Sequence, residues 1–425
     1  MSRLDIVIFG ATGFTGRKAV EEAVRISKKT PISWGVAGRS QQKLEQLLAE
    51  VGAKTGGDDL SKVKMIIADV KDEQSLKDMT SQAKVIANCC GPYRLYGEPV
   101  IKACIATKTH HVDVSGEPQF IESQQLAHGA AAAAAGVYVV SACGFDSIPN
   151  DMGVVFLQQN FPGTLNSVES YLWTHMPDQY YKEMMTGGCI HYGTWESLVY
   201  SLAHSGELSA LRKQLFPTKL PAFKPRLEAR SRVHKHDSKW CLPFPGADNS
   251  IVYRTQRYFY ETKQQRPVQF KAYISMNSLA TTILLILNAV FVSAMTSWGW
   301  SRKLLLNYPR LFSMGMVTHD GPTEGVMDNT FFTFTLRGEG WSEGADMENT
   351  KPDKHMVVKV KGVNPGYGAT VTALMYSALT VLKEQDKMPG TGGVLTTGAA
   401  FKDTSLIKHL NENNLTFEIV CDSKK

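Results

Sequence analysis

Apolar and polar residues follow one spacing up to about residue 150 and a different spacing after it. Up to that point, short apolar runs alternate with stretches whose apolar positions recur every three or four residues, as in 44–51, where Gly52 is expected to end the helix. A second helix is expected at about 118–135. The predicted strands are 4–9, 32–37, 64–68, 84–89, 110–114 and 137–142. This alternation predicts an α/β domain over residues 1–150 with a Rossmann-type, doubly wound parallel sheet.

The first predicted strand runs directly into a turn that has a glycine at every third position. The turn reads Gly10-Ala11-Thr12-Gly13-Phe14-Thr15-Gly16. In a dinucleotide site the first glycine permits the tight turn, the second leaves room for the pyrophosphate, and the third lets the helix lie close to the sheet. The N–H groups that open the helix would face the phosphates. These seven residues are the predicted pyrophosphate site, and a glycine-rich turn without a nucleotide is the alternative.

The end of the second predicted strand distinguishes between two cofactors. An Asp or Glu at this position binds the ribose of NAD, whereas a basic residue accommodates the 2′-phosphate of NADP. The sequence has Arg39, Ser40 and Lys43 here and no carboxylate, which favours NADP(H) over NAD(H). The alternative is that Arg39 is only a surface charge and Ser40 only a helix cap. Asp69, at the end of the third strand, is expected to accept a hydrogen bond from adenine.

The fourth strand ends where the nicotinamide half of the cofactor is expected, because ligands bind at the carboxyl ends of the strands in such sheets. The backbone at Asn88, Cys89 and Gly91 is expected to pass the nicotinamide ribose. We therefore count these three residues among the cofactor-binding residues.

A nicotinamide-dependent reductase also needs a proton donor for the anion that hydride transfer leaves behind. Tyr93 and Tyr96, just after the fourth strand, are the first candidates, and Asp146, after the sixth strand, is the next. The alternative for Asp146 is a helix N-cap. The pair His110 and His111 has no second ligand pair at metal spacing, so no metal is expected.

After about residue 150 the pattern predicts a second α/β domain, 151–387, built on a mixed or antiparallel sheet. Its predicted strands are 166–174, 268–275, 330–337 and 355–361. The stretch 212–248 is rich in Pro and basic residues and is interpreted as a solvated excursion. The final segment, 388–425, contains a second glycine-rich stretch and is expected to return toward the cofactor cleft, although a simple tight loop is equally compatible with it.

The stretch 272–301 contains no Asp, Glu, Lys or Arg. It is long enough to span a bilayer, and Trp298, Trp300 and the basic pair 302–303 resemble interfacial anchors. Several polar residues interrupt it, so a helix or hairpin lying in one leaflet fits the pattern better than a span. A helix buried in the protein is the remaining alternative.

Composition and charge narrow the choice of partner and compartment. With 43% hydrophobic and 20% charged residues, the composition is that of a globular protein. The seven cysteines form no C-x-x-C pair, and the strand that starts at residue 4 leaves no room for a signal peptide, so a cytosolic redox environment is expected. The net charge of +6 is concentrated in 212–239, which has nine Lys/Arg against two acidic residues. The rest is near neutral, and no nucleic-acid partner is expected.

Seven motifs together resemble the animal saccharopine dehydrogenase-like oxidoreductases over nearly the whole chain. They are residues 10–16, 37–40, 88–99, 111–118, 144–153, 252–257 and 392–401. The Gly-Phe-Asp-Ser-Ile-Pro sequence at 144–149 is also similar to microbial trans-acting enoyl reductases of lipid assembly. The resemblance implies an NAD(P)-binding domain, a second α/β domain and association with lipid droplets. It does not imply lysine degradation, because no cluster in the sequence matches the amino-diacid substrate.

Two functions remain as hypotheses. The first is an NADP(H)-dependent reductase of a lipophilic carbonyl or enoyl substrate, at a lipid droplet or on the cytosolic face of the endoplasmic reticulum membrane. The second is a dinucleotide-binding structural or sensor protein of lipid droplets without turnover. Both have a lipid monolayer or membrane surface as partner, and both leave a homodimer possible.

Overall fold

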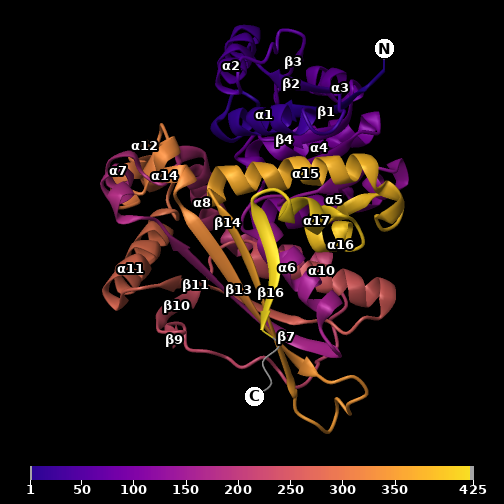
Figure 1. Cartoon of the computed structure of the whole chain (residues 1–425), viewed down its shortest axis with the longest axis vertical. Coiled ribbons are helices and arrows are strands. Elements are labelled where there is room, and N and C mark those ends of the chain that lie inside the picture. The colour runs from indigo at the N-terminus through magenta and orange to yellow at the C-terminus, as the bar shows by residue number, and fades with distance from the viewer. Residues whose placement is uncertain (1, 422–425) are drawn as a thin grey trace.

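The computed structural model describes residues 2–421, which form two large sheets joined by helices (Figure 1). The first sheet has seven parallel strands in the order β15-β6-β5-β4-β1-β2-β3. Its strands are β1 Leu4–Phe9, β2 Trp34–Gly38, β3 Lys64–Ile67, β4 Ala83–Asn88, β5 His110–Asp113, β6 Tyr138–Val140 and β15 Gly393–Leu395. This order confirms the predicted Rossmann-type fold and brings the carboxyl ends of all seven strands to one edge.

Helices cover both faces of this sheet. They are α1 Phe14–Ser27, α2 Gln41–Lys54, α3 Glu73–Ser81, α4 Tyr93–Thr107 and α5 Pro118–Ala135. Helix α6, Ser147–Asn160, follows β6 but packs on the second sheet. The apolar stripe of α2 is buried as its spacing predicts, but Gly52 does not end the helix. A Cβ at Gly52 would lie 2.5 Å from the carbonyl oxygen of Asp58, so this glycine allows the following loop to pack against α2.

The second sheet is mixed, with the strand order β16-β14-β13-β7-β11-β10-β9. Its strands are β7 Thr164–His175, β9 His234–His236, β10 Lys239–Pro243, β11 Gln269–Met276, β13 Phe331–Trp341, β14 Lys354–Val363 and β16 Leu415–Cys421. Strand β7 pairs in parallel with β11 and antiparallel with β13. Alternate residues of β13, such as Phe332, Phe334 and Leu336, are buried in the core, as the two-residue period of a strand requires.

The remaining elements surround this sheet and connect it to the first. The helices are α7 Tyr181–Gly187, α8 Tyr192–Ala203, α9 Leu208–Leu215, α10 Asp248–Lys263, α11 Leu279–Met295, α12 Gly299–Asn307, α13 Pro309–Phe312, α14 Glu324–Asp328, α15 Thr370–Lys383, α16 Thr397–Phe401 and α17 Leu406–Asn411. Strands β8 Ile190–His191 and β12 Val317–Thr318 form a separate small sheet. Helix α15 is buried from Thr370 to Val381 and lies across the boundary between the two large sheets (Figure 1).

Two stretches differ from the sequence prediction. Within the expected excursion 212–248, β9 and β10 extend the edge of the second sheet, and Cys241 is buried there. Both strands are short, and β9 consists only of His and Lys, so the sequence of β9 resembles that of a loop. The uncharged stretch 272–301 begins inside β11, where Ala272 and Tyr273 belong to the core, and only its later part forms α11.

Candidate functional site

The three glycines of the turn after β1 have different surroundings. Gly10 has a φ of +77°, and a Cβ there would lie 3.0 Å from the backbone of Cys89 and Cys90. A Cβ at Gly16 would overlap the carbonyl oxygen of Gly10. A Cβ at Gly13 meets only that same oxygen, at 3.3 Å, which a small shift relieves. Packing therefore requires glycine at positions 10 and 16, whereas at 13 the absent side chain leaves space in front of the turn.

Helix α1 begins at this turn with unused donors. Gly13 is its N-cap and has no side chain that could accept a hydrogen bond. The N–H groups of Phe14, Thr15 and Gly16 belong to the first turn, so they have no acceptor within the helix. By contrast, the N–H of Ala11 already donates to the Ala37 carbonyl oxygen, at 3.3 Å. The turn thus has the space and the donors that a pyrophosphate needs.

The ends of β2, β3 and β4 lie close together beside this turn. Arg39 is exposed and has no ion pair among residues 2–421, and Ser40 caps α2 by accepting a hydrogen bond from the N–H of Lys43 at 3.4 Å. The side chain of Lys43 is exposed. Burial raises the pKa of the Cys90 thiol to about 11, while nearby Arg39 lowers it and Asp69 raises it. Ser40 therefore has the capping role that was left open, and Arg39 is free to bind a phosphate.

Asp69 has a local role besides any contact with adenine, because its carboxylate accepts a hydrogen bond from the N–H of Lys71 at 3.0 Å. Asn88 is fully buried and fixes the turn after β4, since its side-chain oxygen accepts from the N–H of Cys90 at 2.9 Å. Burial raises the pKa of Cys89 to about 12, so this thiol stays protonated. Gly91 is exposed at the same edge.

Tyr93 does not have the free hydroxyl that a proton donor needs. Its hydroxyl donates to the Asn88 carbonyl oxygen at 2.8 Å and accepts from the N–H of Val114 at 3.4 Å, in a buried position. Burial, with a contribution from Asp113, raises its pKa well above the usual value. The geometry gives Tyr93 a structural role, which the sequence could not reveal because it does not show where a side chain points. Tyr96 is half-buried, and its hydroxyl has no partner among the described residues.

Asp146 lies at the N-cap position of α6 but makes no capping hydrogen bond. Its carboxyl group lies next to that of Asp248, the first residue of α10, which is fully buried. The Asp248 carboxylate also accepts from Ser147 Oγ at 3.1 Å and from Asn150 Nδ2 at 2.6 Å. Two neighbouring carboxyl groups repel each other when both are ionised, so the pair favours keeping one proton. Burial raises the pKa of Asp146, and burial and Asp146 together raise that of Asp248.

Asp248 is the functional candidate that the sequence analysis missed. It stands about a hundred positions after Asp146 and belongs to no motif that points to its partner. Asp146 follows β6, while Arg39 follows β2, on the other side of β1 in the sheet order. A dinucleotide bound with its phosphates at the β1 turn and its adenosine near Arg39 would therefore extend toward the carboxyl pair.

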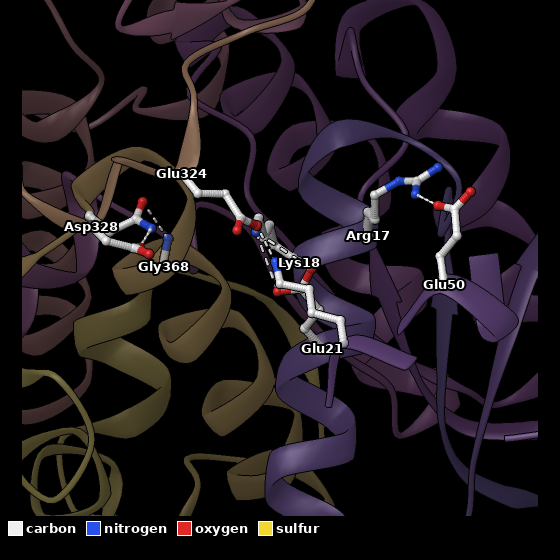
Figure 2. A network of polar contacts seen from close by, with 9 residues as sticks. Arg17, Lys18, Glu21, Glu50, Glu324, Asp328 and Gly368 are labelled. Atoms are coloured by element: carbon white, nitrogen blue, oxygen red, sulfur yellow. Dashed lines mark hydrogen bonds and ion pairs between the residues drawn. The ribbon is translucent and has the colours of Figure 1, made fainter. Parts of the chain in front are cut away.

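The second domain covers the glycine turn from the opposite side. The Phe14 ring stacks on His191 and meets Tyr367 edge-on, with both ring centroids 4.6 Å away. Figure 2 shows the polar contacts next to these rings: Glu324 of α14 faces Lys18 of α1 at 2.9 Å. Glu324 also pairs with Lys54 of α2, and Arg17 with Glu50. The two ion pairs of Glu324 hold α14 against the cofactor domain.

Comparisons with known proteins agree with this geometry. A model of the saccharopine dehydrogenase NADP binding domain matches residues 6–140. The chain is 39% identical to human saccharopine dehydrogenase-like oxidoreductase over 426 residues, 99% of this chain and 98% of that protein. It is 37% identical to the lipid droplet localized protein of Caenorhabditis elegans, over 99% of both chains. The chain belongs to the saccharopine dehydrogenase-like oxidoreductase family.

A solved structure supports the fold of this family member. Apo saccharopine dehydrogenase (L-Glu forming) from Saccharomyces cerevisiae matches with a TM-score of 0.54 and 14% identity, covering 98% of this chain and 100% of that one. At this identity the likeness shows the fold alone. Family membership makes the protein an oxidoreductase with an NADP-binding domain, as the glycine turn predicts.

Helix α11 of this oxidoreductase carries large apolar side chains on its outer face. Leu287, Val290 and Phe291 are 62%, 64% and 53% exposed, and Ile283 and Leu284 lie on the same face. The opposite face, with Val292, packs on the protein body. Other exposed apolar residues follow nearby in the chain: Trp298, Trp300, Tyr308 and Leu311. We define the outer face of α11 together with these four residues as the apolar surface.

Two further observations concern the whole described chain. None of the helices within residues 2–421 combines the length and apolar composition needed to cross a bilayer. In the same residues, no three His, Cys, Asp or Glu side chains are grouped as a metal site requires.

Proposed function

We propose that this protein is an NADP(H)-dependent reductase of a lipophilic carbonyl or enoyl substrate, acting at the surface of a lipid droplet or of the endoplasmic reticulum membrane. The observation that carries the cofactor site is Gly13. Packing does not need glycine there, but a pyrophosphate approaching the uncapped start of α1 does. The match to an NADP binding domain over residues 6–140 supports the same reading.

The preference for NADP over NAD comes from the charge at the end of β2. Arg39 is exposed and unpaired within the described part of the chain, and no carboxylate stands where NAD-binding proteins hold the ribose hydroxyls. A guanidinium group can bind a phosphate through two hydrogen bonds. Lys43, one helical turn further along, adds positive charge on the same side.

Reduction by NADPH requires the protein to position the substrate and the cofactor and to supply a proton. Bound NADPH supplies a hydride to the electrophilic carbon of the substrate, and the oxygen or α-carbon that gains the negative charge must then receive a proton. Asp146, sharing a proton with Asp248, is our candidate donor. The half-buried Asp146 passes the proton on, and the pair regains one from solvent. Buried Asp248 acts as a positioning residue, because it holds Asp146 and keeps a proton in the pair.

The proposed site of action rests on the apolar surface formed by α11 and the residues after it. A contiguous set of large exposed apolar side chains is costly to keep in water and marks a contact with another apolar phase. Tryptophans at the end of such a helix are typical of a lipid interface. A helix lying in one lipid leaflet needs no crossing of a bilayer, and it also suits the monolayer of a droplet.

The direct test is a screen of NADPH oxidation by the purified full-length protein. Substrates are long-chain aldehydes, ketones and trans-2-enoyl thioesters presented in phosphatidylcholine-coated emulsions, with short-chain homologues in buffer as the comparison. We expect turnover with at least one long-chain class and much weaker turnover with its short-chain homologue. NADPH binding without oxidation across all classes would favour the structural or sensor alternative and contradict the reductase proposal.

A further inference from the structure

A cavity of about 1040 Å³ lies in the second domain, apart from the glycine turn. It is formed by α9, the segment 216–226, one side of α10 and the start of β11, with Glu122 of α5 at one end. None of the residues that we assign to the cofactor lines it. We call this cavity the α9–α10 groove. Its volume is at the upper end of the range of about 300–1,000 Å³ that is usual for small-molecule sites.

The polar groups at the base of the α9–α10 groove are already used within the protein. The Gln256 side-chain amide exchanges two hydrogen bonds with that of Gln158, at 2.8 and 3.2 Å, and its oxygen also accepts from the N–H of Val268 at 3.0 Å. Asn249, an exposed lining residue, is used in the same way, because its side-chain oxygen accepts from the N–H of Ala272 at 3.2 Å. A ligand lying along this base therefore finds few polar groups to bind.

Apolar side chains form much of the base and walls of the groove. The apolar side chains that line the groove include Phe216, Leu220, Phe223, Val268 and Phe270. Two guanidinium groups stack on the rings of Phe216 and Phe223, at 4.6 and 4.9 Å, and thereby hold these rings in place. The groove thus suits an elongated apolar chain.

The rim of the groove is positively charged. Its basic residues are Arg212, Lys213 and Arg226, and its one acidic residue is Glu122. Glu122 is already neutralised, because Arg212 binds it in a fork at 2.7 and 2.9 Å and Ser250 donates to it at 2.6 Å. Lys213 and Arg226 are exposed and form no ion pair within residues 2–421. Two cations at the mouth of an apolar trench are left to bind an anion.

We propose that the α9–α10 groove binds a single-chain amphiphile with an anionic head group, such as a carboxylate or a phosphate. The hydrocarbon chain lies against the aromatic and aliphatic walls, and Lys213 and Arg226 hold the head. This site is separate from the dinucleotide site, and the inference does not depend on the proposed reductase activity. It also gives a role to the basic stretch 212–239, whose positive charge the cofactor site does not use.

The test uses the purified full-length protein and isothermal titration calorimetry with laurate below its micelle concentration. Acetate, which has the head without the chain, and dodecanol, which has the chain without the charge, are the comparison ligands. The variant Lys213→Glu/Arg226→Glu removes the two rim cations that form no ion pair and leaves Arg212 with Glu122. The matched control Lys219→Glu/Lys224→Glu makes the same change in net charge within the same segment, at exposed residues that do not line the groove.

We expect the parent protein to bind laurate at least roughly tenfold more tightly than acetate or dodecanol, since chain and head each contribute. Lys213→Glu/Arg226→Glu should weaken laurate binding by roughly tenfold or more, and the matched control should change it by less than about twofold. NADPH binding, measured alongside, should be the same in all three proteins, which shows that they are folded.

Several results would overturn the proposal. They are no laurate binding by the parent, equal weakening in both double variants, or acetate binding as tightly as laurate. A fourth is loss of laurate binding in Leu287→Glu/Val290→Glu, which would assign the ligand to the apolar surface on α11 instead. Weaker attachment of Lys213→Glu/Arg226→Glu to anionic vesicles, with laurate binding unchanged, would assign the basic rim to a membrane and also contradict the groove.

Discussion

Helices α1 and α11 place their apolar faces in opposite environments. In α1, the apolar residues Ala19, Val20 and Ala23 are fully buried against the sheet, and the function lies at the uncapped end of the helix. In α11, Leu287 and Val290 face outward and are more than half exposed. The apolar face of α1 is therefore covered by the protein itself. The outer face of α11 is not, and only a partner outside this chain can cover it.

The difference separates the two parts of the proposed function. Cofactor binding depends on backbone groups and charges at one edge of the first sheet, and lipid contact depends on side chains of the second domain. A change in one region should therefore leave the other intact. The following predictions test this separation, from the largest expected effect to the smallest.

Asp146→Asn should lower turnover by roughly a hundredfold to ten-thousandfold, the usual contribution of a positioned proton donor, with little change in NADPH affinity. Because the protonated pair is the active form, the turnover of the parent should fall as pH rises through the pKa of the pair, and the variant should lack that limb. Stopped-flow NADPH oxidation across pH measures both. A comparable loss in Tyr96→Phe, with Asp146→Asn fully active, would assign the proton to the tyrosine.

Gly13→Val should weaken NADPH binding by roughly a hundredfold or more, because the side chain fills the space in front of the uncapped turn. The protein should stay folded, since only the Gly10 carbonyl oxygen lies near the added Cβ. Calorimetry gives the affinity and thermal unfolding gives the stability. Gly206→Val is the control, at a glycine with open space around it. If Gly13→Val bound NADPH as tightly as the parent, glycine at position 13 would be needed only for the turn and not for the cofactor.

Arg39→Ala should weaken NADPH binding by roughly tenfold to a hundredfold, as expected for losing a charged hydrogen bond worth ~1.5–3 kcal/mol. NADH binding should not change, because NADH lacks the 2′-phosphate. Titration of both cofactors against both proteins makes the comparison. Equal affinities of the parent protein for NADPH and NADH would refute the preference.

Glu324→Gln should have the smallest effect, because the ion pairs of α14 with α1 and α2 are partly exposed to solvent. We expect a loss of ~0.2–1 kcal/mol in the free energy of unfolding, smaller at high salt. Hydrogen bonds from Lys18 and Lys54 lower the pKa of Glu324 from 4.5 to about 2. The ion pairs of Glu324 thus contribute fully to the free energy of unfolding above pH 4.5, and this contribution disappears as pH falls toward 2. Urea unfolding at several pH values measures the free energy of unfolding of the parent and of Glu324→Gln. The two values should become equal in acid, and a difference that stays constant with pH would contradict this prediction.

Much of the first domain could be predicted from the sequence because its signals are local. Strand 4–9 is an apolar run that ends at a glycine, and helix 118–135 ends at Gly136; both bounds agree with the structure. The second domain was less predictable. Its strands β9 and β10 are short, β9 is entirely polar and β10 ends at Pro243, and they form only because β11 offers an edge to pair with.

The candidate site could be predicted only in part for the same reason. The glycine turn and Arg39 follow from spacing along the chain. The role of Tyr93 depends on where its hydroxyl points, and Asp248 becomes a candidate only when folding brings α10 against α6. The exposure of the α11 face is also a tertiary property, because a buried helix remained an alternative from the sequence.

Flotation on phosphatidylcholine-coated triglyceride emulsions tests the separation of the two regions most directly. The variant Leu287→Glu/Val290→Glu places two charges on the exposed face of α11, and Ala49→Glu/Ala53→Glu adds the same two charges on the exposed side of α2. We predict that the parent and the α2 variant float with the emulsion, while the α11 variant stays in the aqueous fraction and binds NADPH as tightly as the parent. Continued flotation of the α11 variant, or loss of NADPH binding together with flotation, would contradict the account.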